Sequence, residues 1–315
     1  MIRAFLVGLG SIGMEYDFED SEALGLTHSR ALENHTAFDF VGCFDIDPTK
    51  RLEIVKKYDV PVFENLLEGL RVTEPDLVII AVPTEFHLDI LTEVLNAIAP
   101  KAILCEKPIV GRPGEIDSIL NLMVNKSTKV FVNYFRNSDP VVLSVRDEIA
   151  FELSDEPFSV RGTYNKGLVH TGSHFLNLLE ILFGEVQSIE KLEQVENNFD
   201  VLDPNVALLA NFKNGSALLT PSMYSDSLKF EMVADFPTKS LVYMNEGEVV
   251  AWMPRSNEIT KLEGLSQFNL RREFKRYQFD VLNEIANYFE NQRHSLCELS
   301  DALRYVVLLG NLQEL

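Results

Sequence analysis

A glycine-rich segment near the start of the chain has the spacing of a phosphate-binding turn. Gly8-Leu9-Gly10-Ser11-Ile12-Gly13 directly follows a short apolar run. Three glycines so spaced permit a tight turn, close approach of the backbone to a pyrophosphate, and close packing of a helix on a strand. Asp45 ends the next apolar run, where its carboxylate can accept hydrogen bonds from an adenosine ribose and repel a 2′-phosphate. Together they predict a dinucleotide site that favours NAD over NADP; the alternative is a structural turn, with Asp45 as a helix cap.

The distance between these two features is unusual. Asp45 lies 32 positions after Gly13, whereas the dinucleotide fingerprint places its acidic residue about 20 positions on. The excess falls in residues 14–27, which carry five acidic side chains and no helical apolar period. We expect a surface loop over the cofactor mouth, acting either as a lid or as a passive solvated loop, with its acidic side chains pointing to solvent.

A lysine follows another predicted strand. Glu106-Lys107-Pro108 comes directly after the apolar residues 102–105. The carboxyl ends of parallel strands are where ligands collect in doubly wound sheets. An ammonium group there can hydrogen-bond a substrate hydroxyl, lower its pKa and orient its carbon. The alternative for Lys107 is a surface lysine in a strand-end turn.

Two histidines and an asparagine occur at helical spacing in the second half. His170, His174 and Asn177 are related as i, i+4 and i+7, which places them on one face of a helix. Histidine suits a general base that takes a hydroxyl proton near neutral pH. A zinc site is the rival explanation for the two histidines, although no cysteine or acidic third ligand lies nearby in sequence.

Polar residues that follow two further strands are candidates for binding a substrate. Asn133 and Arg136 follow the last strand of the first half, and Tyr164 and Lys166 end the strand before the histidine segment. We expect both groups to face a cleft between two domains. Arg136 or Lys166 could bind an anionic group of the substrate; the alternative is a salt bridge between domains.

The apolar pattern predicts two domains of different class. Residues 1–137 alternate short apolar runs with amphipathic stretches, which is typical of a Rossmann doubly wound parallel sheet. Residues 138–315 are predicted to form an α+β domain with a mainly antiparallel sheet, because consecutive strands are joined by short turns. The expected strands are 2–7, 38–44, 77–82, 102–105, 129–133, 158–164 and a series over 186–252. The expected helices are 29–34, 48–58, 64–70, 85–97, 113–124, 172–183, 272–291 and 300–312.

The composition and net charge restrict the classes of protein to which this chain can belong. The 315 residues are 46% apolar and carry a formal net charge of −20, which disfavours nucleic acid and anionic membranes as partners. We find no signal peptide and no apolar run of membrane-spanning length, and three cysteines cannot all pair within one chain. These features predict a cytoplasmic protein with reduced cysteines.

Taken in order, the motifs resemble one family. The glycine segment, His28-Ser29-Arg30-Ala31-Leu32, Phe44-Asp45-Ile46-Asp47, Val82-Pro83-Thr84-Glu85-Phe86-His87, Cys105-Glu106-Lys107-Pro108 and the segment from His170 to Asn177 are similar to those of the glucose-fructose oxidoreductase, inositol dehydrogenase and MocA family of NAD(P)-dependent sugar oxidoreductases. The chain departs from that family in two places. His170 and Asn177 stand where many relatives carry aspartate, which removes negative charge and puts the substrate in doubt more than the reaction.

The resemblance implies a role for each candidate residue. Lys107 would be catalytic and His174 the general base, with His170 beside them. The residues implied to bind the cofactor are Gly8, Gly10, Ser11, Ile12, Gly13, Asp45, Pro83, Thr84, His87 and Glu106. Those expected to bind substrate are Asn133, Arg136, Tyr164, Lys166, His170 and Asn177. No metal is expected.

The expected function is an NAD-dependent oxidoreductase that interconverts a secondary alcohol and a ketone on a sugar, cyclitol or nucleotide-sugar derivative. One alternative is a catalytically silent dinucleotide-binding sensor or scaffold of the same fold. Another is elimination or hydrolysis through transient oxidation, with the cofactor regenerated in each cycle. We expect a homodimer or homotetramer, because a sheet with one open apolar face requires a cover.

Overall fold

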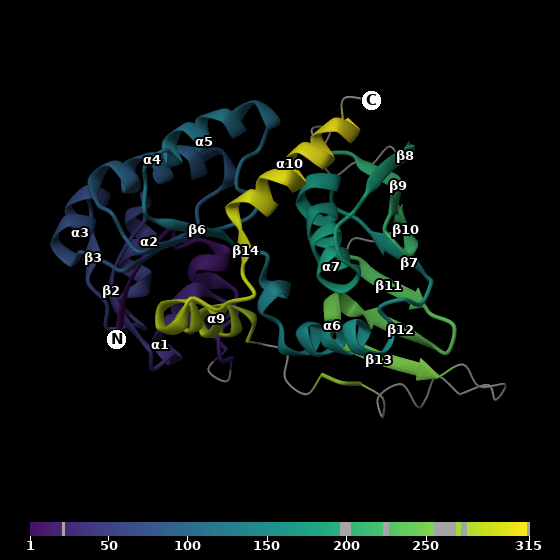
Figure 1. Cartoon of the computed structure of the whole chain (residues 1–315). Coiled ribbons are helices and arrows are strands. Elements are labelled where there is room, and N and C mark those ends of the chain that lie inside the picture. Colours follow the sequence, from purple (N-terminus) through teal and green to yellow (C-terminus); the bar gives the residue numbers. More distant parts are fainter. Residues whose placement is uncertain (21–22, 196–202, 223–226, 255–268, 272–275, 314–315) are drawn as a thin grey trace. The chain divides into compact units, whose positions relative to one another are not determined.

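The computed structural model describes residues 1–20, 23–195, 203–222, 227–254, 269–271 and 276–313 (Figure 1). The chain forms two compact units. Unit 1 comprises Met1–Asp139 and Lys275–Val306, and unit 2 comprises Pro140–Phe274 and Val307–Leu315. In the part of the chain described, no helix combines the length and apolar character needed to cross a membrane.

Unit 1 is built on a seven-stranded sheet, sheet A. Its strand order is β14-β6-β5-β4-β1-β2-β3, with every strand parallel except β14. The strands are β1 (Ile2–Val7), β2 (Phe38–Phe44), β3 (Val62–Phe63), β4 (Leu77–Ile80), β5 (Ala102–Cys105), β6 (Lys129–Val132) and β14 (Cys297–Glu298). Every residue of β4 and β5 is buried, as expected for central strands covered on both faces. The predicted doubly wound parallel sheet is confirmed.

Helices cover both faces of sheet A. Helices α3, α4 and α5 lie on one face, and α9 packs against α1 on the other (Figure 1). The α-helices are α1 (His28–Asn34), α2 (Pro48–Ile54), α3 (Leu66–Thr73), α4 (His87–Ala97), α5 (Ile116–Met123) and α9 (Tyr277–Asn291). Short helical turns lie at η1 (Ser11–Glu15), η2 (Thr84–Phe86), η3 (Pro113–Glu115) and η4 (Phe135–Ser138). The side chains of Thr27, Asp47 and Asn65 cap α1, α2 and α3, because each accepts a hydrogen bond from a first-turn N–H.

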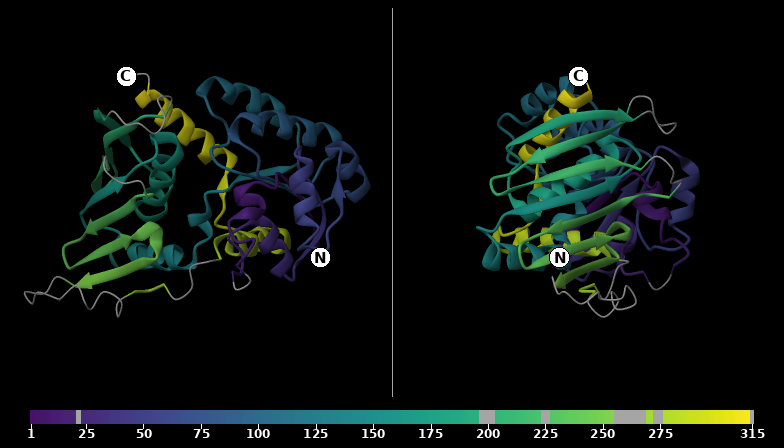
Figure 2. Two further views of the ribbon diagram at one scale, coloured as in Figure 1. Left: turned by 180° about the vertical axis from the view of Figure 1, so that it is seen from behind. Right: turned by 90° about the vertical axis from the view of Figure 1, so that its right-hand side faces the viewer.

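Unit 2 contains a second seven-stranded sheet, sheet B, in the order β13-β12-β11-β7-β10-β9-β8. Only β7 and β10 pair in parallel, so the predicted mainly antiparallel sheet is confirmed. The strands are β7 (Phe158–Tyr164), β8 (Ser188–Val195), β9 (Asn205–Asn211), β10 (Gly215–Pro221), β11 (Phe230–Asp235), β12 (Lys239–Met244) and β13 (Val249–Pro254). Helices α6 (Pro140–Glu152) and α7 (Ser173–Phe183) lie on one face of this sheet (Figure 2). The turns η5 (Leu168–Gly172) and η6 (Asn245–Gly247) complete unit 2, and α10 (Leu299–Gln313) carries the chain from unit 1 into it.

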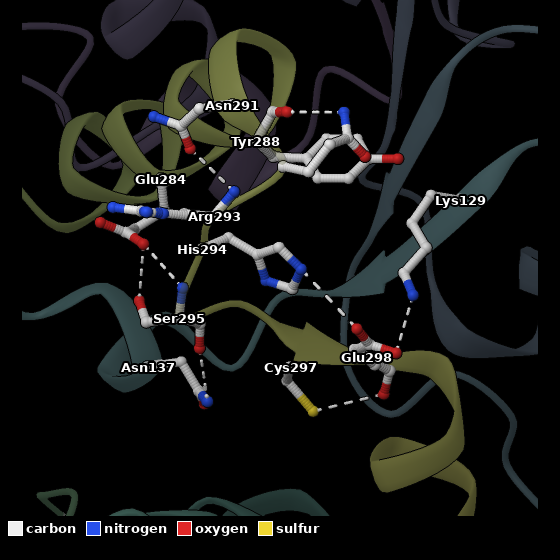
Figure 3. Close-up of polar contacts among 11 residues, drawn as sticks. Lys129, Asn137, Glu284, Tyr288, Asn291, Arg293, His294, Ser295, Cys297 and Glu298 are labelled. Atoms are coloured by element: carbon white, nitrogen blue, oxygen red, sulfur yellow. Dashed lines mark hydrogen bonds and ion pairs between the residues drawn. The ribbon is translucent and has the colours of Figure 1, made fainter.

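The segment that contains α9 and β14 belongs to unit 1, which corrects the predicted division at residues 137 and 138. Val281, Leu282 and Ile285 of α9 are buried in the same core cluster as the strands of sheet A. In the middle of α9, the Glu284 carboxylate accepts hydrogen bonds from both the N–H and the hydroxyl of Ser295 (Figure 3). The carbonyl of Ser295 in turn accepts from Asn137 at 3.0 Å. These contacts fix β14 beside β6.

The insertion at residues 14–27 is anchored by a buried acid, which corrects the expectation that its acidic side chains point to solvent. Asp17 is 1% exposed. Its carboxylate accepts hydrogen bonds from the N–H groups of Leu26 and Thr27, at 2.8 and 3.1 Å, and from the Thr27 hydroxyl at 2.5 Å. Asp17 therefore closes the loop on the residue that caps α1. Glu19 is exposed as expected, Glu15 is partly exposed and paired with Lys50, and Glu22 lies outside the described residues.

Candidate cofactor and active site

In the glycine turn after β1, the space beside the middle glycine, Gly10, is empty of atoms from the residues that the structure describes. Gly8 has φ +99°, and a Cβ there would lie 2.5 Å from the carbonyl oxygen of Ala81. A Cβ on Gly13 would lie 2.2 Å from the Gly8 carbonyl oxygen. Gly10, by contrast, has no atom within 4 Å of the place where its Cβ would be. The outer glycines therefore pack the turn against the sheet, and the middle one leaves backbone that a phosphate can approach.

Asp45 joins the ends of β1 and β2. One carboxylate oxygen accepts a hydrogen bond from the N–H of Leu9 at 2.6 Å, and the other accepts from the N–H of Asp47 at 2.8 Å. Each oxygen of an ionised carboxylate can accept more than one hydrogen bond. The side chain is thus held in place and can still accept bonds from two ribose hydroxyls.

A groove of about 920 Å³ opens beside this turn. Its lining comes from the ends of β1, β2 and β4 and the beginnings of α2, α3 and α4. Sheet order reverses at β1, which has β2 on one side and β4 on the other, and such a switch point is where doubly wound sheets bind ligands. The charged residues that line it are Asp45, Asp47, Lys50, Glu64, Asp89 and Glu93. Five of these six are acidic, so the groove disfavours an additional phosphate dianion.

The predicted cofactor residues fall into distinct places in unit 1. Gly8, Gly10, Asp45 and Pro83 line the groove. Ser11, Ile12 and Gly13 form the turn that begins beside it, and Thr84 begins η2 after Pro83. Two of the predicted residues, His87 and Glu106, have side chains engaged in contacts within the protein.

Glu106 is held by His28 of α1 and by Asn133, which follows β6. Its Oε1 lies 2.8 Å from Nε2 of His28 and accepts a hydrogen bond from the Asn133 amide at 2.6 Å. The Asn133 amide also donates to Gln278 of α9 at 2.9 Å. Burial raises the pKa of Glu106, but the hydrogen bonds from His28 and Asn133 and the charge of Lys107 outweigh it, so the pKa lies below its ordinary value. Glu106 therefore anchors the turn that presents Lys107.

The other side of this turn is held by His87. Its two ring nitrogens each lie 2.9 Å from a backbone oxygen, Nδ1 from Pro108 and Nε2 from Val82. The side chain is 1% exposed. His87 thus connects Val82, just after β4, to the carbonyl of Pro108, the residue that follows Lys107 through a cis peptide bond. The structure gives His87 a positioning role, and the partly exposed Lys107 follows β5 from a turn fixed on both sides.

Two of the predicted substrate residues, Tyr164 and Asn133, have side chains engaged in contacts within the protein, and their binding of a substrate stays a prediction. Tyr164 is fully buried, and its hydroxyl donates to the Val206 carbonyl at 2.6 Å and accepts from the Val206 N–H at 3.0 Å. Burial raises the pKa of this hydroxyl. The donors of Asn133 are taken by Glu106 and Gln278, as described above. Arg136 is also buried, with its guanidinium 4.5 Å from the centre of the Phe135 ring.

The histidine segment lies in unit 2 where a helix was predicted. His170 is exposed in η5, His174 is partly buried in the first turn of α7, and Asn177 is buried one turn later. Lys166, partly buried, stands just before η5 with φ +61°. Among the described residues, these histidines belong to no group of three or more potential metal ligands.

A residue that sequence analysis missed fixes the start of this segment. The Asp203 carboxylate accepts hydrogen bonds from the N–H groups of Val169 and His170, at 2.7 and 2.8 Å. Asp203 is more than 30 positions away, and no local spacing connects it to the histidines. The same is true of Gln278 in unit 1. His28 was noted as part of a motif, but only the fold shows that it contacts Glu106.

Comparisons with known proteins agree with this arrangement over the first unit. Residues 2–134 match the family described as "Oxidoreductase family, NAD-binding Rossmann fold", Gfo/Idh/MocA. An uncharacterized oxidoreductase of Schizosaccharomyces pombe is 29% identical over 154 residues, covering 43% of this chain and 41% of that protein. Inositol 2-dehydrogenase of Rhizobium meliloti is 28% identical over 127 residues, covering 40% of this chain and 37% of the relative. The matched region is thus less than half the length of these relatives.

Solved structures share the fold over nearly the whole chain. The WlbA dehydrogenase of Bordetella pertussis, in complex with NADH and UDP-GlcNAcA, has a TM-score of 0.76 at 13% identity and covers 99% of this chain and 94% of that one. An oxidoreductase of Agrobacterium radiobacter in complex with NAD+, L-tartaric acid and magnesium has a TM-score of 0.72 at 12% identity, with coverages of 99% and 95%. Residues 2–134 thus match the Gfo/Idh/MocA family of oxidoreductases with an NAD-binding Rossmann fold, and the chain as a whole shares the fold of these solved structures.

Proposed function

We propose that the protein is an NAD-dependent oxidoreductase that interconverts a secondary alcohol and a ketone on a sugar, cyclitol or nucleotide-sugar derivative. The observation that carries this proposal is the acidic groove at the switch point of sheet A, bordered by an open glycine turn and an anchored Asp45. The Lys107 turn, at the carboxyl end of β5 in the same sheet, supplies a cation suited to a reacting oxygen.

The residues present fit a nicotinamide dinucleotide. The backbone around Gly10 would hold the pyrophosphate, since no side chain fills that space. The Asp45 carboxylate would accept hydrogen bonds from the adenosine ribose. When bound, the nicotinamide supplies the two-electron redox chemistry as hydride transfer.

The protein's own part is to position the substrate and manage one proton. Lys107 would hydrogen-bond the oxygen that alternates between hydroxyl and carbonyl and stabilise the negative charge that develops on it. His174 would take the hydroxyl proton in the direction of oxidation and return it in reduction. His170, Lys166 and Asn177 would bind other polar groups of the substrate.

We infer the substrate class from proteins that are similar to this chain in sequence or in fold. Relatives of the first unit include inositol 2-dehydrogenases, and a protein of the same fold was solved with a nucleotide sugar. His170 and Asn177 carry no fixed negative charge, so they would admit an anionic substituent that a pair of aspartates would repel. We propose a cytoplasmic homodimer or homotetramer that works on a small polyhydroxy substrate.

Cofactor choice gives the first test. Calorimetric titration of the wild type is expected to show NAD(H) binding about tenfold or more tightly than NADP(H), because a like-charged pair in a groove is costly. Asp45→Asn should bring the ratio of the NAD(H) affinity to the NADP(H) affinity closer to one. The ratio is the informative quantity because Asp45 also accepts a hydrogen bond from the Leu9 N–H. Its replacement is therefore expected to weaken the binding of both dinucleotides. Equal affinities in the wild type would contradict the role given to Asp45.

A further inference from the structure

The insertion between the glycine turn and α1 is held at several points. Asp17 is buried in the hydrogen bonds described above. The guanidinium of Arg30 donates to the carbonyl oxygens of Asp17 and Asp20, at 3.2 and 3.0 Å. The Lys57 ammonium lies 4.4 Å from the centre of the Phe18 ring. The described residues of the insertion are therefore fixed to unit 1, and Glu15 near its start has a defined place.

Glu15 forms an ion pair with Lys50 of α2. Its carboxylate also lies 3.3 Å from the Ser11 hydroxyl, in the turn that begins at the glycine segment. The two side chains of the pair are partly exposed, 38% for Glu15 and 27% for Lys50. The pair thus connects the insertion to the rim of the groove.

Lys50 has a special position in that groove. It is the only basic residue in the lining that the structure describes, and it stands in the first turns of α2, close in sequence to Asp45 and Asp47. A 2′-phosphate on the adenosine ribose would enter the region that Asp45 faces, where a basic side chain is what such a group requires. Lys50 is therefore the groove's available cation for NADP.

The ion pair withholds that cation. With Glu15 beside its ammonium group, the positive charge of Lys50 is balanced by a carboxylate. A phosphate dianion would have to displace that carboxylate while it approached a second carboxylate at Asp45. NAD makes no such demand, because its ribose offers hydroxyls only. The charge of Lys50 also keeps Glu15 from adding a net negative charge beside the pyrophosphate turn.

We propose that Glu15 is a specificity-determining residue and that the insertion restricts the enzyme to NAD by holding Lys50 away from the 2′-position. The inference rests on the proposed function, since it presupposes that the groove takes a dinucleotide. Cofactor choice would then be set from two sides of the groove, by Asp45 at the end of β2 and by Glu15 from the insertion.

The test compares NAD and NADP binding by calorimetry in four variants. Glu15→Gln keeps the size of the side chain and frees Lys50, so it should raise NADP affinity about tenfold while NAD affinity changes by about twofold or less. Adding Lys50→Met to Glu15→Gln should abolish that gain, and Lys50→Met alone should weaken NAD, because it leaves Glu15 unpaired near the pyrophosphate. Glu19→Gln, which removes an exposed acid of the same insertion, should change neither affinity.

Three outcomes would overturn the inference, and a fourth would overturn the function beneath it. An NADP affinity in Glu15→Gln equal to that in Glu19→Gln would show that the pair does not restrict NADP. A gain that survives in the double variant would show that Lys50 is not the group released. If Lys50→Met binds NAD as tightly as the wild type does, the Glu15–Lys50 pair lies away from the pyrophosphate. Failure of the wild type to bind either dinucleotide would refute the proposed function itself, whereas the first three results leave it standing.

Discussion

Lys107→Ala is expected to lower turnover about 10²-fold or more on any substrate that the wild type oxidises, because it removes the cation placed on the reacting oxygen. NAD affinity should change little, since the proposed contacts of the dinucleotide lie at the glycine turn and Asp45. Steady-state rates and calorimetry on the same preparation check both statements.

The matched control for this variant is Lys101→Ala. Lys101 precedes β5 at its amino end, is 69% exposed and pairs with Asp76 at 3.0 Å, so its loss changes the same net charge without touching the carboxyl ends of the strands. Turnover of this control should remain near that of the wild type. A Lys107→Ala enzyme as fast as the Lys101→Ala control would contradict the role assigned to Lys107.

His174→Ala is expected to cause a loss of similar size, about 10²-fold to 10⁴-fold, because positioned proton transfer contributes that much to the rate. His174→Gln separates proton transfer from hydrogen bonding, since glutamine keeps polar atoms but cannot take the proton. Both variants should be slow if His174 is the base. If His174→Gln retains the wild-type rate, His174 is a binding residue, and His170 with Lys166 becomes the pair to test.

The elements around the cofactor groove were predictable because they depend on local patterns. The five predicted strands of unit 1 lie where apolar runs end in glycine, acidic or lysine-containing segments, and β1, β2 and β5 have the predicted bounds. The two strands that were missed, β3 and β14, are two residues long. Such short strands exist because a neighbouring strand pairs with them, so they leave no apolar period in the sequence.

What could not be predicted depends on contacts between residues far apart in the chain. The Asp17 carboxylate is buried because the insertion folds back on Thr27, which composition alone does not reveal. The 3.6-residue period of α9 predicts a helix but not the unit on which it packs. Tyr164 ends a strand, as predicted, yet the alternation of β7 turns its hydroxyl inward to Val206.

The same reason explains the site around Lys107. Glu106, Lys107 and Pro108 were identified from their place after a strand. The residues that hold this turn are His28, His87, Asn133 and Gln278, which come from four separate elements or their ends. The motif identified the turn, whereas only the fold shows which residues hold it.

The most direct test of the central claim is a single-turnover measurement of NAD reduction. Wild-type protein with stoichiometric NAD would be mixed with members of a panel of sugars, cyclitols and nucleotide sugars. The absorbance of NADH would be followed from the first milliseconds, so that NADH that is formed and then reoxidised within the cycle is also detected. We predict formation of NADH with at least one member of the panel. Binding of NAD without reduction by any member, together with sugars that raise the melting temperature, would contradict the claim and identify a sensor.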